Sequence, residues 1–255
     1  MAPSCPGELL EEAVDLVREA GELTLRWFRS DDLAVDRKDD GTPVTEADRA
    51  AEQLLRQRLE QRHPGDAILG EEEGGSDGTT GRRWVIDPID GTKAFTRGVP
   101  LYTNLLAADD EHGPLLGVVN MPALGETVYA GRGIGCFCDG RPARVSSRDD
   151  LTTAYVTTSG FGGWSEQALV ALRQAGVHLR TWGDGYGYAL VATGRVEAMV
   201  DSRASEWDLA PMPVILSEAG GTFTSMAGRP AIDGGSGLAS NGILHDQLVE
   251  LLAAA

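Results

Sequence analysis

The sequence predicts a mixed α/β (α+β) protein, and three patterns along the chain support this fold class. The first half contains apolar, β-prone segments joined by short turns, which indicates an antiparallel sheet. The second half alternates strand-like and helix-like segments, which is typical of an α/β layer. A polar stretch over residues 145–152 separates the two patterns. We therefore expect an α+β half over residues 1–145 and an α/β half over residues 146–255, joined in one structural unit.

Two helices and a series of strands account for the first half. Apolar residues at helical spacing predict one helix over 6–29 and another from Thr45 to a stop at 63–65. Polar and glycine residues predict a turn over 38–43. The β-prone runs predict strands over 33–36, 67–69, 84–86, 101–108, 115–121, 127–130 and 134–138.

The second half reads as strands and helices in alternation. Residues 183–187 contain three glycines and join a strand to a helix, where ligand contacts are common, although plain turn chemistry explains them equally well. The expected strands span 155–158, 178–182, 196–200, 222–225 and 238–240, and the expected helices span 165–175, 186–193, 206–218 and 243–252.

Length, charge and cysteine content limit the classes of protein. A chain of 255 residues is long enough for one large domain or two small ones that share a core. The net charge of −17 predicts repulsion from nucleic acid and from anionic membranes, and no segment has the ~20 apolar residues that span a bilayer. The three cysteines lack zinc-ribbon spacing, and no signal peptide is visible, so we expect reduced thiols and a cytoplasmic location.

The stretch over residues 84–92 contains two aspartates three residues apart, directly after an apolar strand. Pro88 stiffens the turn that we expect there, so Asp87 and Asp90 can face one point. Two such carboxylates repel each other unless a proton or a cation lies between them, and hard oxygen ligands favour Mg²⁺ over Zn²⁺. The alternative is a turn in which the aspartates satisfy only their own backbone. Gly91 lets backbone N–H groups approach an anion.

Three further acidic positions have a structural and a chemical interpretation. Thr45 and Asp48 have capping-box spacing, and the same geometry would also place Asp48 at a helix start that faces a metal cluster. Glu71 lies in a run of three glutamates that reads as a solvated surface, yet it follows a strand end and would lie beside the aspartates if the two strands are neighbours. Asp208 opens a helix, where a lone aspartate normally caps the backbone.

Considered together, these residues resemble the inositol monophosphatase superfamily from the Asp48 helix to the C-terminus. The motifs are Gly70-Glu71-Glu72, the hexapeptide over 87–92, and Trp207-Asp208 followed by Glu-Ala-Gly-Gly over 218–221. The resemblance implies a layered αβαβα sandwich that is usually a homodimer. It also implies Mg²⁺, as two or three ions held by Glu71, Asp87, the backbone carbonyl of Ile89, Asp90 and Asp208, with Asp48 near a further, weaker ion.

The resemblance further assigns roles in hydrolysis of a small phosphomonoester. Glu71 and Thr92 match the pair that orients the attacking water, and we expect Thr92 to be hydrogen-bonded to Glu71, which takes the proton. Gly91 and Thr92 match backbone donors to the phosphate. Asp184 and Asp201 are the candidates for substrate contacts, because Asp201 matches a position that meets the leaving-group alcohol. A strand-end surface acid is the alternative for Asp201.

Motifs at residues 90–95, 97–100 and 240–245 resemble the histidinol-phosphate phosphatase branch, and this resemblance narrows the choice of substrate. We therefore predict Mg²⁺-dependent hydrolysis of L-histidinol phosphate, a step of histidine biosynthesis. The alternatives are a phosphatase for inositol 1-phosphate, another cyclitol or a sugar phosphate, and a non-catalytic module that binds a metal or a phosphorylated ligand. Pro211 and Pro213 depart from the family pattern and remove backbone donors, which leaves the position of Asp208 open.

Overall fold

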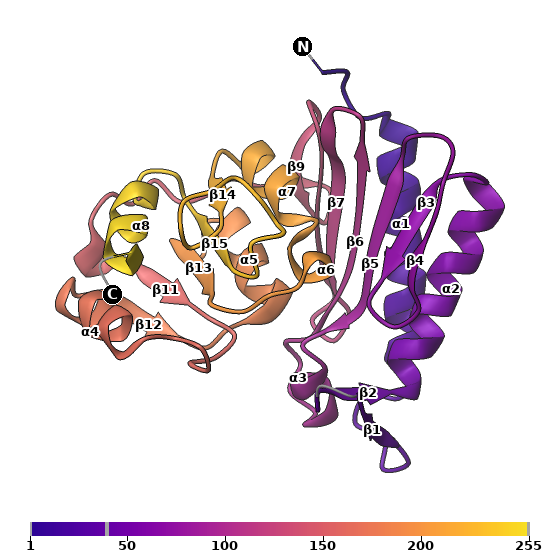
Figure 1. The fold of residues 1–255 in the computed structure, drawn as a ribbon, viewed down its shortest axis with the longest axis horizontal. Helices are drawn as coiled ribbons and strands as arrows, with labels where there is room; N and C mark the ends of the chain where they lie inside the picture. Colours follow the sequence, from indigo (N-terminus) through magenta and orange to yellow (C-terminus); the bar gives the residue numbers. More distant parts are fainter. Residues whose placement is uncertain (1, 39–40, 254–255) are drawn as a thin grey trace.

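Helices and sheets alternate in five layers. We analysed a computed structural model that describes residues 2–38 and 41–253, so residues 39–40 of the turn expected over 38–43 lie outside the described part. Figure 1 shows a pair of helices, a large sheet, a middle layer of helices, a smaller sheet and an outer pair of helices. The layered αβαβα sandwich is therefore confirmed. None of the helices described is both long and apolar enough to span a bilayer.

The outermost layer at one end is formed by helices α1 (Gly7–Thr24) and α2 (Glu46–Arg62). Both bury one apolar face against the large sheet, as Leu16 of α1 and Leu55 of α2 do. Helix α1 ends five residues earlier than the spacing predicts. The Thr24 hydroxyl donates a hydrogen bond to the carbonyl of Gly21 at 2.8 Å, and turns follow instead of helix.

The large sheet has eight strands in the order β10-β9-β8-β7-β6-β5-β3-β4. Strands β3 and β5 are parallel and the other neighbours are antiparallel. The strands are β3 (Ala67–Gly70), β4 (Gly74–Ser76), β5 (Arg83–Asp90), β6 (Thr103–Asp110), β7 (Gly113–Met121), β8 (Glu126–Gly131), β9 (Gly135–Cys138) and β10 (Arg141–Pro142). A separate ribbon of β1 (Val35–Arg37) and β2 (Pro43–Thr45) leads into α2.

The smaller sheet has five strands in the order β12-β11-β13-β15-β14, of which the first three are parallel. The strands are β11 (Tyr155–Thr157), β12 (His178–Arg180), β13 (Ala198–Asp201), β14 (Thr222–Thr224) and β15 (Gly237–Ser240). A 3₁₀ turn, η1 (Leu151–Thr153), precedes the sheet. Helices α5 (Asp184–Ala192), α6 (Glu206–Leu209) and α7 (Met212–Ala219) lie between the sheets, and α4 (Glu166–Gln174) and α8 (His245–Ala253) cover the far face.

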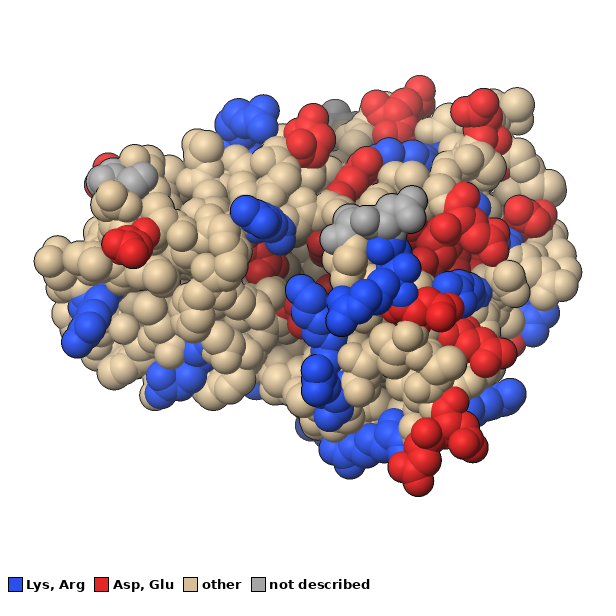
Figure 2. Space-filling model, turned by 60° about the horizontal axis from the view of Figure 1, so that its bottom comes forward, with Lys and Arg blue, Asp and Glu red and all other residues tan. Residues whose placement is uncertain are grey.

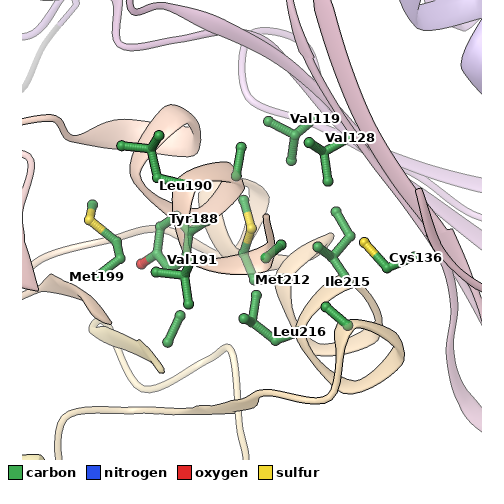
Figure 3. Packing of buried hydrophobic residues seen from close by; sticks show 14 of the residues in the cluster. Val119, Val128, Cys136, Tyr188, Leu190, Val191, Met199, Met212, Ile215 and Leu216 are labelled. Atoms are coloured by element: carbon green, nitrogen blue, oxygen red, sulfur yellow. The ribbon is translucent and has the colours of Figure 1, made fainter. Parts of the chain in front are cut away.

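The two halves share a core between the sheets. Figure 3 shows Val119 and Val128 of the large sheet facing Met212 and Ile215 of α7, with Val191 of α5 close by. All five side chains are fully buried. Separation of the two halves would expose these apolar side chains to water, which is unfavourable. The shared core therefore supports one structural unit. The division at residue 145 stays a prediction.

One expected helix is two helices. The sequence predicts a helix over 206–218, but α6 ends at Leu209 and α7 begins at Met212. Pro211 precedes the first residue of α7 and has no N–H to continue the hydrogen bonds of α6. The short helix α6 therefore presents its own first turn, which includes Asp208, toward the end of β5.

Candidate active site

Strand β5 places both central aspartates on one side of the sheet. The strand was expected to end at Ile86, but it continues to Asp90. Asp87 lies opposite Leu105 and Asp90 lies opposite Thr103, so β5 has one residue more than β6 between these pairs. Residues three apart in a regular strand point to opposite faces, and this bulge reverses the alternation. The expectation of a turn after Ile86 is therefore wrong, but the expectation that both carboxylates face one point is confirmed.

A cluster of carboxylates lies at this bulge. Asp87, Asp90 and Asp208 each offer an oxygen atom, and these atoms lie within 4.8 Å of one another. Asp208 reaches the cluster from α6, where its carboxylate also accepts a hydrogen bond from Ser205 N at 2.7 Å. Asp208 is thus both a helix cap and a member of the cluster, and the two prolines after it do not displace it.

Glu71 joins the cluster because β3 and β5 are neighbours. Its backbone N–H donates to Ile86 O at 3.2 Å, and its carboxylate interacts with that of Asp87. The interpretation of Glu71 as part of a solvated surface is therefore wrong. The ammonium of Lys38 lies 2.7 Å from a carboxylate oxygen of Glu71 and 2.7 Å from one of Glu72. The sequence offered no signal for this contact, because Lys38 lies in an expected turn.

The cluster resists ionisation. Burial raises the pKa of Asp87 and Asp90 well above the ordinary range, and the neighbouring carboxylates raise it further. Burial also raises the pKa of Asp208 to about 6 and raises that of Glu71, although the hydrogen bond from Lys38 opposes the second shift. Carboxylates that repel each other in a buried site need a proton or a cation between them.

The cluster fits a hard divalent cation. The Oδ1 atom of Asp87 is buried and has no hydrogen-bond partner among the described residues, which is costly unless an ion or a proton satisfies it. The available ligands are carboxylate oxygens and the carbonyl of Ile89, and the neighbours of the cluster include no cysteine or histidine within the described ranges. An all-oxygen set is the one that Mg²⁺ prefers.

Asp48 and Thr92 lie together beside this cluster. The capping box is confirmed, since Thr45 N donates to Asp48 Oδ2 at 2.8 Å. The hydroxyl of Thr92 lies 3.0 Å from Ile89 O and 3.3 Å from Asp48 Oδ1. The expected hydrogen bond from Thr92 to Glu71 is therefore not made here. Thr92 begins helix α3 (Thr92–Thr96) directly after the left-handed Gly91, which turns its hydroxyl back toward Asp48.

Asp201 lies at the end of β13 and faces the same cavity. Its residue is only 6% exposed, so the interpretation as a surface acid is wrong. The Tyr188 hydroxyl donates to Asp201 Oδ2 at 3.0 Å, and Ser159 N donates to Oδ1 at 3.2 Å. Burial raises the pKa of Asp201. Tyr188 was not predicted, although it follows Asp184 by four residues, which is one helical turn.

The glycine-rich segment over residues 183–187 forms the start of α5 and is part of the site, not only a turn. Asp184 has a φ of 55°, and burial raises its pKa to about 6. Gly185 donates its backbone N–H to Asp90 Oδ2, and a Cβ at Gly185 would lie 2.3 Å from the hydroxyl of Thr103. Gly91, with a φ of 84°, is equally confined, because a Cβ there would lie 2.8 Å from Asp184 Oδ2. Both glycines permit close contact between the halves.

A cavity of about 610 Å³ connects these groups. Six carboxylates line it, namely those of Glu71, Asp87, Asp90, Asp184, Asp201 and Asp208. Its mouth is basic, since the exposed side chains of Lys93, Arg97 and Arg203 line it. Figure 2 shows basic side chains gathered on this face next to a hollow in which acidic side chains are visible. On a chain with a net charge of −17, such a mouth attracts an anion locally.

The basic mouth attracts an anion, and the carboxylates behind it need a cation between them. Metal-assisted hydrolysis of a phosphate ester requires an anion-binding surface and a cation-binding cluster in one place. The fold and the cavity thus define the class of phosphoric monoester hydrolases that work at an acidic cluster. A family model described as the inositol monophosphatase family matches residues 6–255, and the chain belongs to this family. It is therefore a phosphatase of phosphomonoesters, and the alternative of a non-catalytic module is set aside.

Individual relatives match over almost the whole chain. The histidinol-phosphatase of Mycobacterium tuberculosis is 44% identical over 95% of this chain and 96% of its own length. The histidinol-phosphatase of Chlorobaculum parvum is also 44% identical, over 91% of each chain. Among solved structures, the IMPase of Thermotoga maritima is 32% identical, covers 97% of each chain and superposes with a TM-score of 0.88.

Proposed function

We propose that this phosphatase hydrolyses L-histidinol phosphate to L-histidinol and phosphate, as a step of histidine biosynthesis. The similarity to two relatives that are named histidinol-phosphatase supports this substrate. The observation that carries the proposal is the pair Asp184 and Asp201, whose carboxylates line the same cavity as the carboxylate cluster. Buried carboxylates at that position suit the cationic amine of histidinol, because an opposite charge stabilises their ionised form.

The proposed cofactor is Mg²⁺, as two ions held by Glu71, Asp87, the carbonyl of Ile89, Asp90 and Asp208, with a third and weaker ion near Asp48. This ligand set is supported by the close approach of three carboxylate oxygens and by Oδ1 of Asp87, which has no hydrogen-bond partner among the described residues. When bound, Mg²⁺ would neutralise the phosphoryl oxygens and lower the pKa of a water molecule.

Protein groups around the cluster have separate proposed tasks. Glu71 is the acceptor for the proton of the attacking water, and Thr92 orients that water together with Asp48, which lies 3.3 Å from the Thr92 hydroxyl. The backbone N–H groups of Gly91 and Thr92 bind the phosphate, which is supported by their position on the cavity wall. The basic mouth brings the dianion to these groups.

Inositol 1-phosphate is the second candidate substrate, together with other cyclitol and sugar phosphates. The similarity in fold and sequence to the IMPase of Thermotoga maritima favours it. A neutral polyol gains only hydrogen bonds from Asp184 and Asp201, whereas an ammonium group gains charge pairing as well. The two substrates therefore differ in how strongly they depend on the charge of Asp201.

Two properties of the whole molecule complete the proposal. A homodimer is supported by membership of the inositol monophosphatase family, whose members are usually homodimers. A cytoplasmic location is supported by three cysteines that form no disulfide. Light scattering of the purified protein tests the first property.

A substrate panel tests the proposed function. Phosphate release should be measured with Mg²⁺ on histidinol phosphate, inositol 1-phosphate and 3′-phosphoadenosine 5′-phosphate, for the wild type and for Asp201→Asn. Histidinol phosphate should have the highest kcat/KM, and Asp201→Asn should reduce kcat/KM for this substrate by roughly tenfold to hundredfold and for inositol 1-phosphate much less. A flat response to histidinol phosphate would end this choice of substrate.

A further inference from the structure

A buried ion pair on α2 contacts the turn that carries Glu71. Glu52 has no exposed surface, and its Oε1 accepts a hydrogen bond from Arg56 Nε at 2.8 Å. The same carboxylate accepts two backbone N–H groups, from Glu72 to Oε2 at 2.8 Å and from Glu73 to Oε1 at 3.0 Å. Arg56 also donates to the carbonyl of Gly74. The turn between β3 and β4 is therefore bonded to α2 at three consecutive residues.

Glu71 lies directly between two anchors. On one side its backbone N–H bonds to Ile86 O at 3.2 Å, which continues the pairing of β3 with β5. On the other side the next two peptide groups are held by Glu52. Two fixed peptide groups leave the Glu71 backbone little freedom, so the direction of its side chain toward Asp87 is set before any ion arrives.

The ion pair of Glu52 and Arg56 can approach the turn only because residue 70 is a glycine. A Cβ at Gly70 would lie 2.0 Å from Oε1 of Glu52 and 2.7 Å from a guanidinium nitrogen of Arg56. The φ of Gly70 is not positive, so the glycine serves the close approach of the ion pair and not the backbone conformation. The Gly70-Glu71-Glu72 motif thus contains one residue for the cation and two for the contact with α2.

We propose that Glu52 is a positioning residue for the metal ligand Glu71, an inference that rests on the proposed role of Glu71 in binding Mg²⁺. Its carboxylate has acceptors only, which matches the three donors that face it. A glutamine at this position would turn an NH₂ group toward at least one of these donors. One peptide group of the turn would then lose its acceptor, and Glu71 would be released from its orientation.

A second buried glutamate provides a matched control. Glu197 is 2% exposed, accepts the backbone N–H of Tyr155 at 2.7 Å and is paired with Arg148 at 3.2 Å. It precedes β13, at the opposite end of that strand from Asp201. Replacement of Glu197 by glutamine disturbs the same kinds of bonds without touching the cavity.

The test is calorimetric titration of Mg²⁺ into the full-length wild type, Glu52→Gln and Glu197→Gln, with melting temperatures measured in the absence of Mg²⁺. Both variants should melt earlier than the wild type. Only Glu52→Gln should raise the Kd for Mg²⁺, by roughly tenfold to hundredfold, as is usual when a group that orients a metal ligand is lost. An unchanged Kd in Glu52→Gln, or an equal rise in Glu197→Gln, would overturn the inference.

A milder variant decides the matter if Glu52→Gln does not fold. Arg56→Gln keeps both acceptors of Glu52 and removes the cation that holds them together with its bond to Gly74 O, so it should raise the Kd for Mg²⁺ by a smaller factor. A wild-type Kd in a folded Arg56→Gln protein would then refute the inference. A wild type that binds no Mg²⁺ would refute the proposed ligand set itself, and the inference with it.

Discussion

Replacement of Asp90 by asparagine should stabilise the metal-free protein while it removes the response to Mg²⁺. Asp90 is 8% exposed, and the repulsion from Asp184 and Asp208 adds to the cost of its burial. Its Oδ2 accepts hydrogen bonds from Thr103 Oγ1 at 3.1 Å and from Gly185 N. An asparagine oxygen can accept both bonds, and its NH₂ group faces the remaining carboxylates favourably.

The expected magnitude follows from the spacing of the cluster. Two unit charges about 5 Å apart repel by about 3 kcal/mol at an effective dielectric constant of about 20, and proton uptake lowers this figure. A gain of about 1–3 kcal/mol corresponds to a rise in Tm of about 2–6 °C for a chain of this size. Mg²⁺ at a hundredfold excess over its Kd should add about 2.7 kcal/mol to the wild type and nothing to Asp90→Asn.

Differential scanning fluorimetry at pH 8 with EDTA or with Mg²⁺ measures both effects. Asp66→Asn is a suitable control, because this buried carboxylate accepts a hydrogen bond from Trp84 Nε1 at 2.9 Å and lies 3.6 Å from Arg82. It should lower Tm and keep the response to Mg²⁺. If Asp90→Asn melts no later than the wild type with EDTA, or still responds to Mg²⁺, our account of the repulsion in the cluster is refuted.

Two further predictions concern protons and substrate contacts. Burial raises the pKa of Asp48 and Asp208 from the ordinary 3.8 to about 6, so their contribution to the stability of the metal-free protein is full below about pH 4 and is lost as the pH rises through about 6. The rise in Tm caused by Mg²⁺ should therefore be larger at pH 8 than at pH 5.5, and an equal rise would contradict these assignments. Tyr188→Phe removes a hydrogen bond to Asp201 and should raise KM for histidinol phosphate by roughly tenfold with a smaller change in kcat. A wild-type KM would show that the orientation of Asp201 does not matter for binding.

Most strands of the first half were predictable because β-prone segments alternate with short turns at regular spacing, but β2, β4 and β10 were not predicted. The unexpected length of β5 has a tertiary cause. Pro88 is a signal for the end of a strand, but β6 continues to pair with β5 through a bulge, and the side chain of Asn104 donates to Pro88 O at 2.6 Å. Local sequence cannot reveal such a partner, because the hydrogen bond joins segments that are distant along the chain.

The carboxylate cluster was predictable from the motifs that contain Glu71, Asp87 and Asp208, and the structure brings these residues together. Their roles in binding Mg²⁺ stay predictions. The contacts of Lys38 with Glu71 and Glu72 and of Glu52 with the β3–β4 turn were not predictable, because each depends on how α2 and its preceding ribbon pack against the sheet. Residues that support a site leave a weaker pattern in a single sequence than the residues that form it.

The central claim is that carboxylates distant along the chain share divalent cations in one cavity. A crystal structure of the protein grown with Mn²⁺, with anomalous scattering used to locate the ion, tests this claim most directly. We expect an anomalous peak bound simultaneously by Asp87, Asp90 and Asp208. Carboxylates that point to different places, with no ion in common, would contradict the account.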